Sequence, residues 1–352
     1  MWLLAQALAR LGASVCLVVF DSGGELPSSV NGVQLVRRRP YRAGTGSRRK
    51  AREAAEIHAS IAAANAEAVV ARGARPLVAQ VALSCKVQRR RFVYSSASIA
   101  DFELERMDPR RRNVALFDLA IRLADTIVVQ TEEQLVMCQR RFRRTPIVIR
   151  SVAERTATRA RQPEAFLWAG RVCWYKRPLA YVELARAVPE ARFWMVPVPE
   201  HSDDSRLLLE QVTRAASELP NLELLEPCPR ERLTQLMERS VAVVNTADFE
   251  GLSNTLLEGW ARGIPALALS HDPDGLIQRL QLGIFAHGSP ERLVAAAHHL
   301  WAARADQDAI SNRCRRYVTE HHNPEIVYER WLDVLGVTPP SQVFEPDMVE
   351  AL

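Results

Sequence analysis

The segment NTADFEGLSNTLLEGWARGIPALAL (residues 245–269) carries the clearest structural pattern in the chain. It starts at the end of an apolar, β-rich run (241–245) and passes through a short loop into a helical stretch near 253–262. Ser or Asn can cap the start of this helix, and Gly263 can end it before the next apolar run. The segment therefore predicts a strand–loop–helix–strand unit, which is the repeating element of a parallel α/β sheet.

The rest of the second half repeats this alternation. We expect strands at 166–169, 192–196, 222–225, 241–245 and 265–269, with helices beginning at Pro178, running through 208–219, and lying near 230–239 and 253–262. Strands separated by helices of this length imply βαβ units and a parallel sheet that is covered on both faces.

The first half also has an α/β pattern. We expect strands near 14–20, 33–37, 77–83, 91–95, 126–130 and 146–150, and helices near 46–65, 112–124 and 132–143. The polar segment 151–165 lacks apolar periodicity and is the best linker candidate. We therefore predict two Rossmann-like domains, 1–158 and 159–322, followed by a C-terminal helix and tail, 323–352, with the helix packing back toward the N-terminal domain.

The composition excludes several classes of protein. Of 352 residues, 48% are hydrophobic and 25% are charged, which is typical of a folded globular chain. No apolar run approaches the roughly 18 residues that a membrane span needs, and Arg10 interrupts the apolar N-terminus, which makes a poor secretory signal. The six cysteines are scattered singly with no CxxC pair, so we expect neither disulfides nor a zinc site, and a cytoplasmic protein.

Lysine is rare in this chain, and this makes Lys176 informative. The 46 basic residues are 43 arginines and three lysines, so arginine serves the generic basic positions. An expected strand ends at Gly170, Arg171 follows directly, and Lys176 comes five residues later, just before a helix start. Two cations beyond the carboxyl end of a strand are well placed to bind a diphosphate, although a basic surface loop would give the same pattern.

Two glutamates lie at the start of the helix that begins near residue 254. Glu250 lies in the loop before the helix, and Glu258 lies one turn inside it. The helix start offers backbone N–H groups to a phosphate, and the two carboxylates could hold different hydroxyls of one extended ligand. Solvated glutamates on a surface helix are the ordinary alternative.

Together these stretches resemble the donor-binding domain of family 4 retaining glycosyltransferases, which have the GT-B fold. The family pattern is G-R-x4-K after a strand, then E-G-x-x-N-T-x-x-E about seventy residues later. The chain matches it at Gly170, Arg171, Lys176, Glu250, Gly251, Asn254, Thr255 and Glu258. The resemblance covers roughly 165–335 and implies two Rossmann-like domains with parallel sheets facing a cleft.

The resemblance implies a metal-independent hexosyltransferase that moves a sugar, with retention, from a nucleotide-diphosphate sugar. The acceptor would be a saccharide, a lipid-linked molecule or a small molecule, as in polysaccharide biosynthesis. Arg171 and Lys176 would bind the diphosphate, and Glu258 the ribose hydroxyls. Glu250, and the backbone from Gly251 to Thr255, would bind the sugar and its phosphate; that backbone comprises Gly251, Leu252, Ser253, Asn254 and Thr255. No cofactor is implied.

Two departures from the family pattern leave alternatives open. The sequence begins with residues of the first helix, so we expect the N-terminal domain to lack the family's usual first strand and glycine-rich loop. Between His58 and His201 there is no histidine where family members have one, and Ser95, Ser96 and Asp101 occupy the corresponding segment. The alternatives are a GT-B epimerase, a GT-B phosphorylase, which should have a pyridoxal lysine, or a sugar-nucleotide-binding GT-B protein with impaired catalysis.

Other signals carry less weight. The HDPDG loop (271–275) contains a DxD, which holds a metal in another transferase fold, but we interpret it as a Pro/Gly loop. Arginine clusters in the N-terminal half are solvated surface or a face for anionic lipid, which would give peripheral contact at the inner side of the membrane. They lie at 37–39, 89–91, 110–112 and 140–144. These clusters lack interleaved aromatics, so we expect no nucleic-acid binding.

Overall fold

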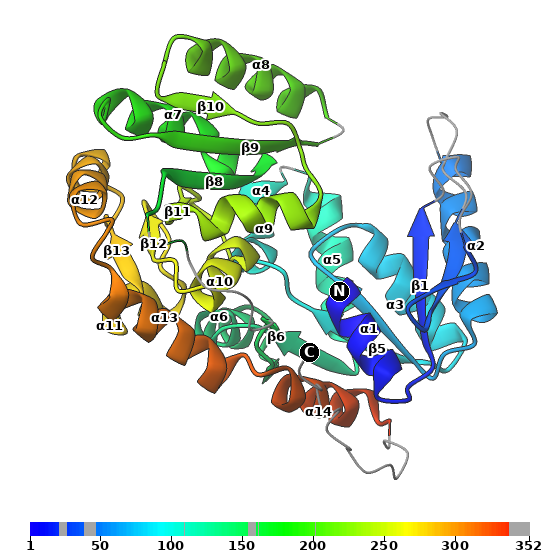
Figure 1. The fold of residues 1–352 in the computed structure, drawn as a ribbon. Coiled ribbons are helices and arrows are strands. Elements are labelled where there is room, and N and C mark those ends of the chain that lie inside the picture. The colour runs from blue at the N-terminus through cyan, green and yellow to red at the C-terminus, as the bar shows by residue number, and fades with distance from the viewer. Residues whose placement is uncertain are drawn as a thin grey trace. The chain divides into compact units, whose positions relative to one another are not determined.

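A computed structural model describes residues 1–20, 27–38, 47–108, 110–153, 160, 162–200 and 202–337. The chain divides into two compact units. The first unit comprises Met1–Ser95, Arg110–Val128 and Glu325–Leu352, and the second comprises Ser96–Pro109 and Val129–Pro324. Each unit is built from strands and helices, coloured along the chain in Figure 1.

The second unit contains a six-stranded sheet in which every neighbouring pair is parallel. Its strands are β8 (Ala165–Val172), β9 (Phe193–Pro199), β10 (Leu222–Leu224), β11 (Ser240–Asn245), β12 (Ala266–Ala268) and β13 (Gly283–Phe285). The order across the sheet is β10-β9-β8-β11-β12-β13. The chain thus builds outward in one direction from β8 and then restarts on the other side at β11, which is the doubly wound Rossmann order.

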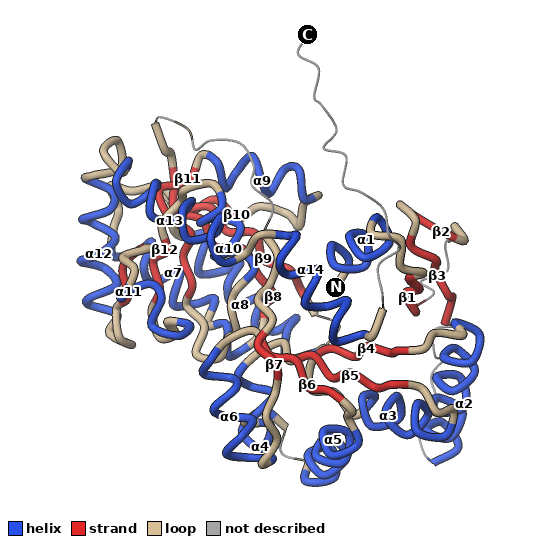
Figure 2. The backbone as a smooth tube through the Cα atoms, turned by 90° about the horizontal axis from the view of Figure 1, so that it is seen from below, coloured by secondary structure: helices blue, strands red, loops and turns tan. Residues whose placement is uncertain are grey.

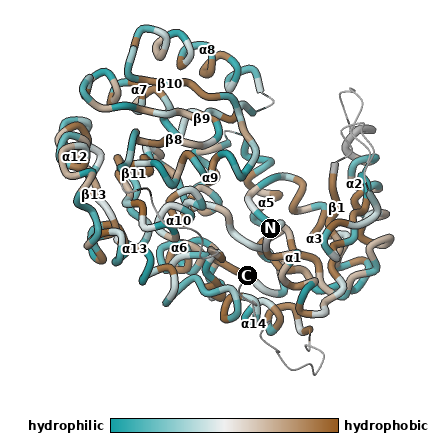
Figure 3. The backbone as a smooth tube through the Cα atoms, in the orientation of Figure 1, coloured by the Kyte–Doolittle hydropathy of each residue, from teal (hydrophilic) through white to brown (hydrophobic). Residues whose placement is uncertain are grey.

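Helices cover both faces of this sheet, as the apolar strands predict. They are α7 (Pro178–Ala187), α8 (Asp203–Ser217), α9 (Arg230–Glu238), α10 (Asn254–Ala261), α11 (Leu276–Arg279), α12 (Pro290–Ala302) and α13 (Asp308–His321). Side chains alternate along each strand: Phe166 packs in a core with residues of α7, α8 and α12, whereas Leu167 packs with residues of α10 and α13. Because both faces are buried, β9 and β11 are apolar over most of their lengths (Figure 3).

The second unit also holds the segments that precede this sheet in sequence. They form the short helices η1 (Ile99–Phe102) and α4 (Leu104–Met107), then α6 (Glu132–Phe142) and β7 (Ile147–Val148). The loop after β8 contains η2 (Trp174–Lys176), and the loop after β12 contains η3 (Pro273–Gly275).

The first unit has two smaller sheets. One has the order β1-β3-β2, with β1 (Val15–Phe20) parallel to β3 (Val33–Arg38) and β2 (Ser29–Val30) antiparallel to it. In the other, β4 (Ala68–Arg72), β5 (Arg91–Ser95) and β6 (Thr126–Val129) lie side by side in parallel (Figure 2). The helices of this unit are α1 (Trp2–Arg10), α2 (Ser47–Ala64), α3 (Leu77–Val87), α5 (Arg111–Leu123) and α14 (Pro324–Leu335).

One predicted strand is wrong. The segment 77–83 belongs to helix α3, and the strand of this region is β4, nine residues earlier. The run LVAQVAL is short and apolar like a buried strand. The helix continues to Val87, however, and its buried residues include Val78, Ala79, Ala82 and Cys85, which share one helical face. The length of the segment decides between a strand and a helix, because the 11 residues of α3 suit a helix better than a buried strand.

The remaining expected strands and helices are present, with ends that shift by a few residues. The predicted boundary between 158 and 159 lies outside the described residues, as does the tail 338–352, so the predicted domain limits stay predictions. None of the described helices is both long and apolar enough to cross a bilayer.

Candidate functional site

The candidate site lies between β8 and β11, where the order in which the chain adds strands to the sheet of the second unit reverses. Strands β8 and β11 are neighbours, yet the connections that leave them run to opposite sides of the sheet. Ligands of doubly wound sheets bind beyond the carboxyl ends of such strands, because the two departing loops leave a crevice between them. An open pocket lies there, lined by residues that include Trp168, Gly170, Lys176, Asn245, Ser253 and Thr255.

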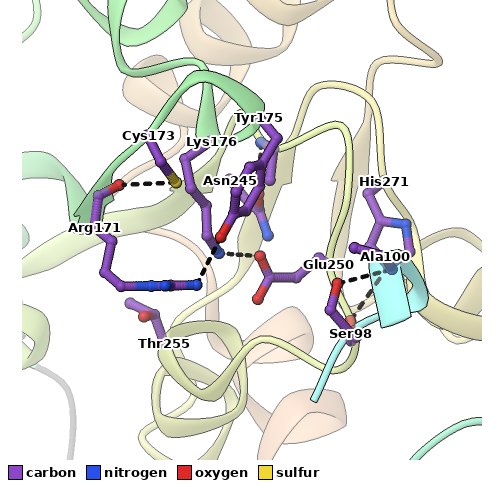
Figure 4. A network of polar contacts seen from close by, with 12 residues as sticks. Ser98, Ala100, Arg171, Cys173, Tyr175, Lys176, Asn245, Glu250, Thr255 and His271 are labelled. Atoms are coloured by element: carbon purple, nitrogen blue, oxygen red, sulfur yellow. Dashed lines mark hydrogen bonds and ion pairs between the residues drawn. The ribbon is translucent and has the colours of Figure 1, made fainter. Parts of the chain in front are cut away.

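Lys176 and Glu250 meet in this region. Their side chains point toward one another and form an ion pair in which the Lys176 ammonium donates to the Glu250 carboxylate (Figure 4). Both side chains are largely buried, with 18% and 15% of their surfaces exposed. The structure thus brings together two predicted site residues that are 74 positions apart in the chain.

A buried hydroxyl fixes the backbone beside Lys176. Thr246 donates to the Lys176 carbonyl oxygen (2.7 Å) and accepts a hydrogen bond from the Trp168 indole (3.0 Å). The Asp248 N–H also donates to the Tyr175 carbonyl oxygen (2.8 Å). The loops after β8 and β11 are therefore joined by their backbones as well as by the Lys176–Glu250 pair.

Arg171 is held by two partners at the end of β8. Its guanidinium donates to the Glu200 carboxylate (2.5 Å) and to the Tyr175 hydroxyl oxygen (2.7 Å; Figure 4). Burial raises the pKa of the Tyr175 hydroxyl, so this partner stays neutral. Glu200 is positioned in turn by Ser205, whose hydroxyl accepts from the Glu200 N–H (2.9 Å) and donates to the Val172 carbonyl oxygen (2.6 Å).

Helix α10 begins at the pocket. Ser253 is its N-cap residue, and its hydroxyl makes no capping hydrogen bond with any described residue. The backbone N–H groups of the first turn, which has Asn254 and Thr255 at its start, are therefore not used by a side-chain cap. Thr255 itself donates to the Ala169 carbonyl oxygen at 3.4 Å, and Leu252 is buried in the core of this unit.

Backbone contacts fix the loop around Glu250 and Gly251. The Glu250 carbonyl oxygen accepts from the Ile99 N–H (3.1 Å), and the Gly251 carbonyl oxygen lies 3.2 Å from Nε2 of the buried His271. A Cβ atom at Gly251 would lie only 2.9 Å from the carbonyl oxygen of Ala97 and from Nε2 of Gln134. Glycine is therefore required at this position by close approach.

Glu258 lies one turn inside α10, as the sequence predicts. Its carboxylate forms an ion pair with the Arg230 guanidinium at 3.2 Å, and its carbonyl oxygen accepts from Arg262 (2.9 Å). Sequence reasoning missed Glu200 and Arg230 as partners of predicted site residues. Glu200 lies four residues beyond the expected strand 192–196, and it directly follows β9 because that strand extends to Pro199.

Two other candidate segments have structural roles. Asp101 accepts from the Ser96 hydroxyl (3.0 Å) and the Ala97 N–H (2.7 Å), which holds the loop before η1. In the DxD loop, Asp272 accepts from backbone N–H groups of α11, and Asp274 accepts from those of Glu132 and Glu133 at the start of α6. Both carboxylates of the DxD thus cap helices. No group of three or more metal-ligating side chains occurs within the described residues.

This architecture is the GT-B fold of glycosyltransferases. The chain resembles sucrose-phosphate synthase from Thermosynechococcus elongatus with a TM-score of 0.76 and 14% identity, over 94% of this chain and 90% of that one. It resembles Anabaena HepE, solved with UDP-glucose, with a TM-score of 0.69 and 14% identity, over 86% of this chain and 85% of that one.

A third similar structure is TarM from S. aureus, solved with fondaparinux, α-GlcNAc-glycerol and UDP. The TM-score is 0.65 and the identity 14%, over 80% of this chain, which spans only 58% of the TarM chain. No protein-family model matches the sequence, and no curated protein matches it. At an identity of 14%, these structural similarities show a shared fold and no more.

Proposed function

We propose that this chain is a glycosyltransferase that moves a sugar from a nucleoside-diphosphate sugar to an acceptor hydroxyl. The observation that carries the proposal is the pocket beyond the carboxyl ends of β8 and β11, which is lined by Lys176 and by the start of α10. A cation and a helix N-terminus both attract phosphate, and together they suit a diphosphate. HepE was solved with UDP-glucose and TarM with UDP, which supports a nucleotide ligand for a chain of this fold.

The chemistry needs positive charge where the donor breaks. The bond between the anomeric carbon and the diphosphate oxygen breaks with its electron pair, so negative charge grows on the diphosphate. An acceptor hydroxyl oxygen bonds to the anomeric carbon, and its proton passes to the departing diphosphate. Lys176, Arg171 and the α10 N-terminus would stabilise the growing charge without a metal, since fixed cations and dipoles need no reorganisation during the reaction.

The remaining predicted residues would hold parts of the donor that do not change charge. We propose that Glu258 accepts hydrogen bonds from the ribose hydroxyls and that Glu250 accepts from the hydroxyls of the transferred hexose. For Glu250 this requires that Lys176 share its ion pair with the diphosphate once the donor binds. Retention of configuration and a family 4 type of transferase follow from the resemblance of the motifs and remain proposals.

The acceptor belongs to the proposal as well. We propose a saccharide, a lipid-linked molecule or a small molecule as acceptor, with peripheral contact to the inner face of the membrane through the arginine clusters. Arg39, in the first of these clusters, lies outside the described residues. Binding to anionic vesicles that falls as salt rises would support this contact, because screening weakens exposed charge interactions.

A second candidate function is nucleotide-sugar binding without efficient transfer. It is favoured by the segment 95–101, where Ser96 and Asp101 hydrogen-bond to each other rather than offering a free acid or base. The two candidates differ in turnover, not in binding. A chain that binds a nucleoside diphosphate but releases none from any nucleotide-sugar in the presence of acceptors would favour the second.

Calorimetric titration of the full chain with UDP, GDP and ADP tests the proposed function. We expect at least one of the three to bind, with an affinity that falls when the Lys176 side chain is removed. Failure of all three to bind would contradict the proposed donor site under either candidate function.

A further inference from the structure

Arg230 is the one described side chain that contacts the Glu258 carboxylate. Nη2 of Arg230 lies 3.2 Å from Oε1 of Glu258, so one carboxylate oxygen is engaged by a single guanidinium nitrogen. Resting on the proposed function, we infer that Arg230 is a positioning residue of the ribose end of the donor site. It holds the Glu258 carboxylate in the orientation that accepts the ribose hydroxyls.

The burial of Glu258 separates this pair from ordinary surface ion pairs. The Glu258 side chain is 23% exposed and that of Arg230 is 50% exposed, whereas in the Arg206–Asp203 pair of α8 the two side chains are 67% and 84% exposed. Exposed pairs hold their side chains weakly because water and salt screen them. A carboxylate that is mostly enclosed has fewer orientations to choose from, so a single cationic partner can fix it.

The backbones on both sides of the pair are also fixed. The Glu258 carbonyl oxygen accepts from Arg262, whose side chain is 5% exposed. Arg230 begins α9, and Leu233 of that helix packs in the same apolar core as Leu256 and Leu257 of α10. Apolar packing between α9 and α10 therefore fixes the backbone position of Arg230 relative to Glu258 before any ligand binds.

The single contact leaves room for a ribose. A carboxylate has two oxygens with about four lone pairs, and the Arg230 guanidinium lies against Oε1 as an ion-pair partner. The other oxygen can accept hydrogen bonds from the neighbouring 2′- and 3′-hydroxyls of a ribose. Hydrogen bonds to a charged group are strong, and they depend on angle, so loss of orientation should weaken the contact to these hydroxyls specifically.

A ligand lacking one hydroxyl tests this inference. The probes are whichever of UDP, GDP and ADP binds the wild-type chain best, and the 2′-deoxy form of the same nucleotide. Calorimetry gives the affinity lost with the hydroxyl in wild type, Arg230→Ala, Arg230→Lys and Glu258→Gln. Arg232→Ala is the matched control, because Arg232 is an exposed arginine of the same helix that contacts Gln235 instead.

We expect the 2′-deoxy form to bind wild type about tenfold more weakly than the parent nucleotide. This penalty should fall to threefold or less in Arg230→Ala and in Glu258→Gln, recover in part in Arg230→Lys, and stay at the wild-type value in Arg232→Ala. An unchanged penalty in Arg230→Ala would overturn the inference, even if that variant bound both nucleotides more weakly. Absence of nucleotide binding by wild type would instead contradict the proposed function itself.

Discussion

The loops that follow β8 and β11 supply the two halves of the candidate site. Hydrogen bonds to backbone carbonyl oxygens join them, but the two loops offer different groups to a ligand. The end of β8 and the loop after it present cationic side chains: Arg171, in the strand, is paired with Glu200, and Lys176, in the loop, with Glu250. The β11 loop is held through its backbone, by Ile99 at the Glu250 carbonyl oxygen and by close packing around Gly251. One side of the site therefore provides cationic side chains, and the other provides a tightly packed backbone.

This difference indicates which part of the proposed sugar transfer each loop serves. Paired cations can change partner when a diphosphate binds, so the β8 loop suits charge that grows during the reaction. A loop fixed by backbone contacts cannot move without cost, so the β11 loop suits parts of the donor that are the same before and after bond breaking. The predictions below test this division, from the largest expected effect to the smallest.

Removal of the Lys176 side chain should have the largest effect. Lys176→Ala removes a cation that faces growing negative charge, so we expect kcat to fall by about 100-fold or more, with a smaller change in KM. The measurement is release of nucleoside diphosphate from the nucleotide-sugar that the titrations identify.

Lys86→Ala is the control for this variant. It also removes a lysine and breaks an ion pair, that with Asp125 at 2.7 Å, but this pair belongs to the first unit. We expect its kcat to match wild type. A Lys176→Ala variant that raised KM and left kcat unchanged would break the proposed division, because the cation would then serve ground-state binding alone.

Glu258→Gln should act on binding instead. The carboxylate is proposed to accept hydrogen bonds from ribose in both the ground state and the transition state, so its loss should weaken donor binding by about 1.5 to 3 kcal/mol. Titration with the free nucleoside diphosphate measures this loss, and kcat at saturating donor should stay near the wild-type value. A variant with normal affinity and low kcat would place Glu258 with the cations of the β8 loop.

Gly251→Ala tests the shape of the β11 loop. The added methyl group would meet the Ala97 carbonyl oxygen and the Gln134 side chain at 2.9 Å, so the loop must shift. We expect a loss of about 1 to 3 kcal/mol in the free energy of unfolding, typical of overpacking, together with weaker binding of the nucleotide-sugar.

A nearby glycine provides the matched control for that substitution. A Cβ atom at Gly170 would meet only the Trp168 ring, at 3.7 Å, which is ordinary contact. Denaturant unfolding of Gly170→Ala should therefore change little. Equal destabilisation by the two variants would mean that close approach around Gly251 is not what holds the loop.

The sequence predicted most of the second unit because its local signals agree. Apolar strands, helix starts such as Pro178 and stops such as Gly263 recur at the spacing of βαβ units, and the structure confirms them. The positions of Arg171, Lys176, Glu250 and Glu258 relative to strand and helix ends follow from the same pattern. The approach of Lys176 to Glu250 follows from the strand order, in which β8 and β11 become neighbours.

Contacts between distant segments could not be predicted in this way. Ile99 and Glu250 are joined by a backbone hydrogen bond, and backbone N–H groups carry no residue-specific signal in a sequence. Arg230 is one of 43 arginines, so nothing in its identity distinguishes it before α9 and α10 are packed. The error at 77–83 has another cause, because an apolar run of seven residues fits a strand and a helix about equally well.

Removal of divalent metals should have the smallest effect. If the cations of the β8 loop and the start of α10 stabilise the diphosphate, turnover in excess EDTA should stay within about twofold of the untreated rate. The DxD loop provides a specific check, since Asp272 and Asp274 accept hydrogen bonds from the backbone at the starts of α11 and α6. Asp274→Asn should therefore lower stability without creating a need for metal. The opposite result would be that EDTA abolishes turnover, that manganese restores it in wild type, and that manganese does not restore it in Asp274→Asn. That result would assign the charge stabilisation to the DxD loop and contradict the division between the two loops.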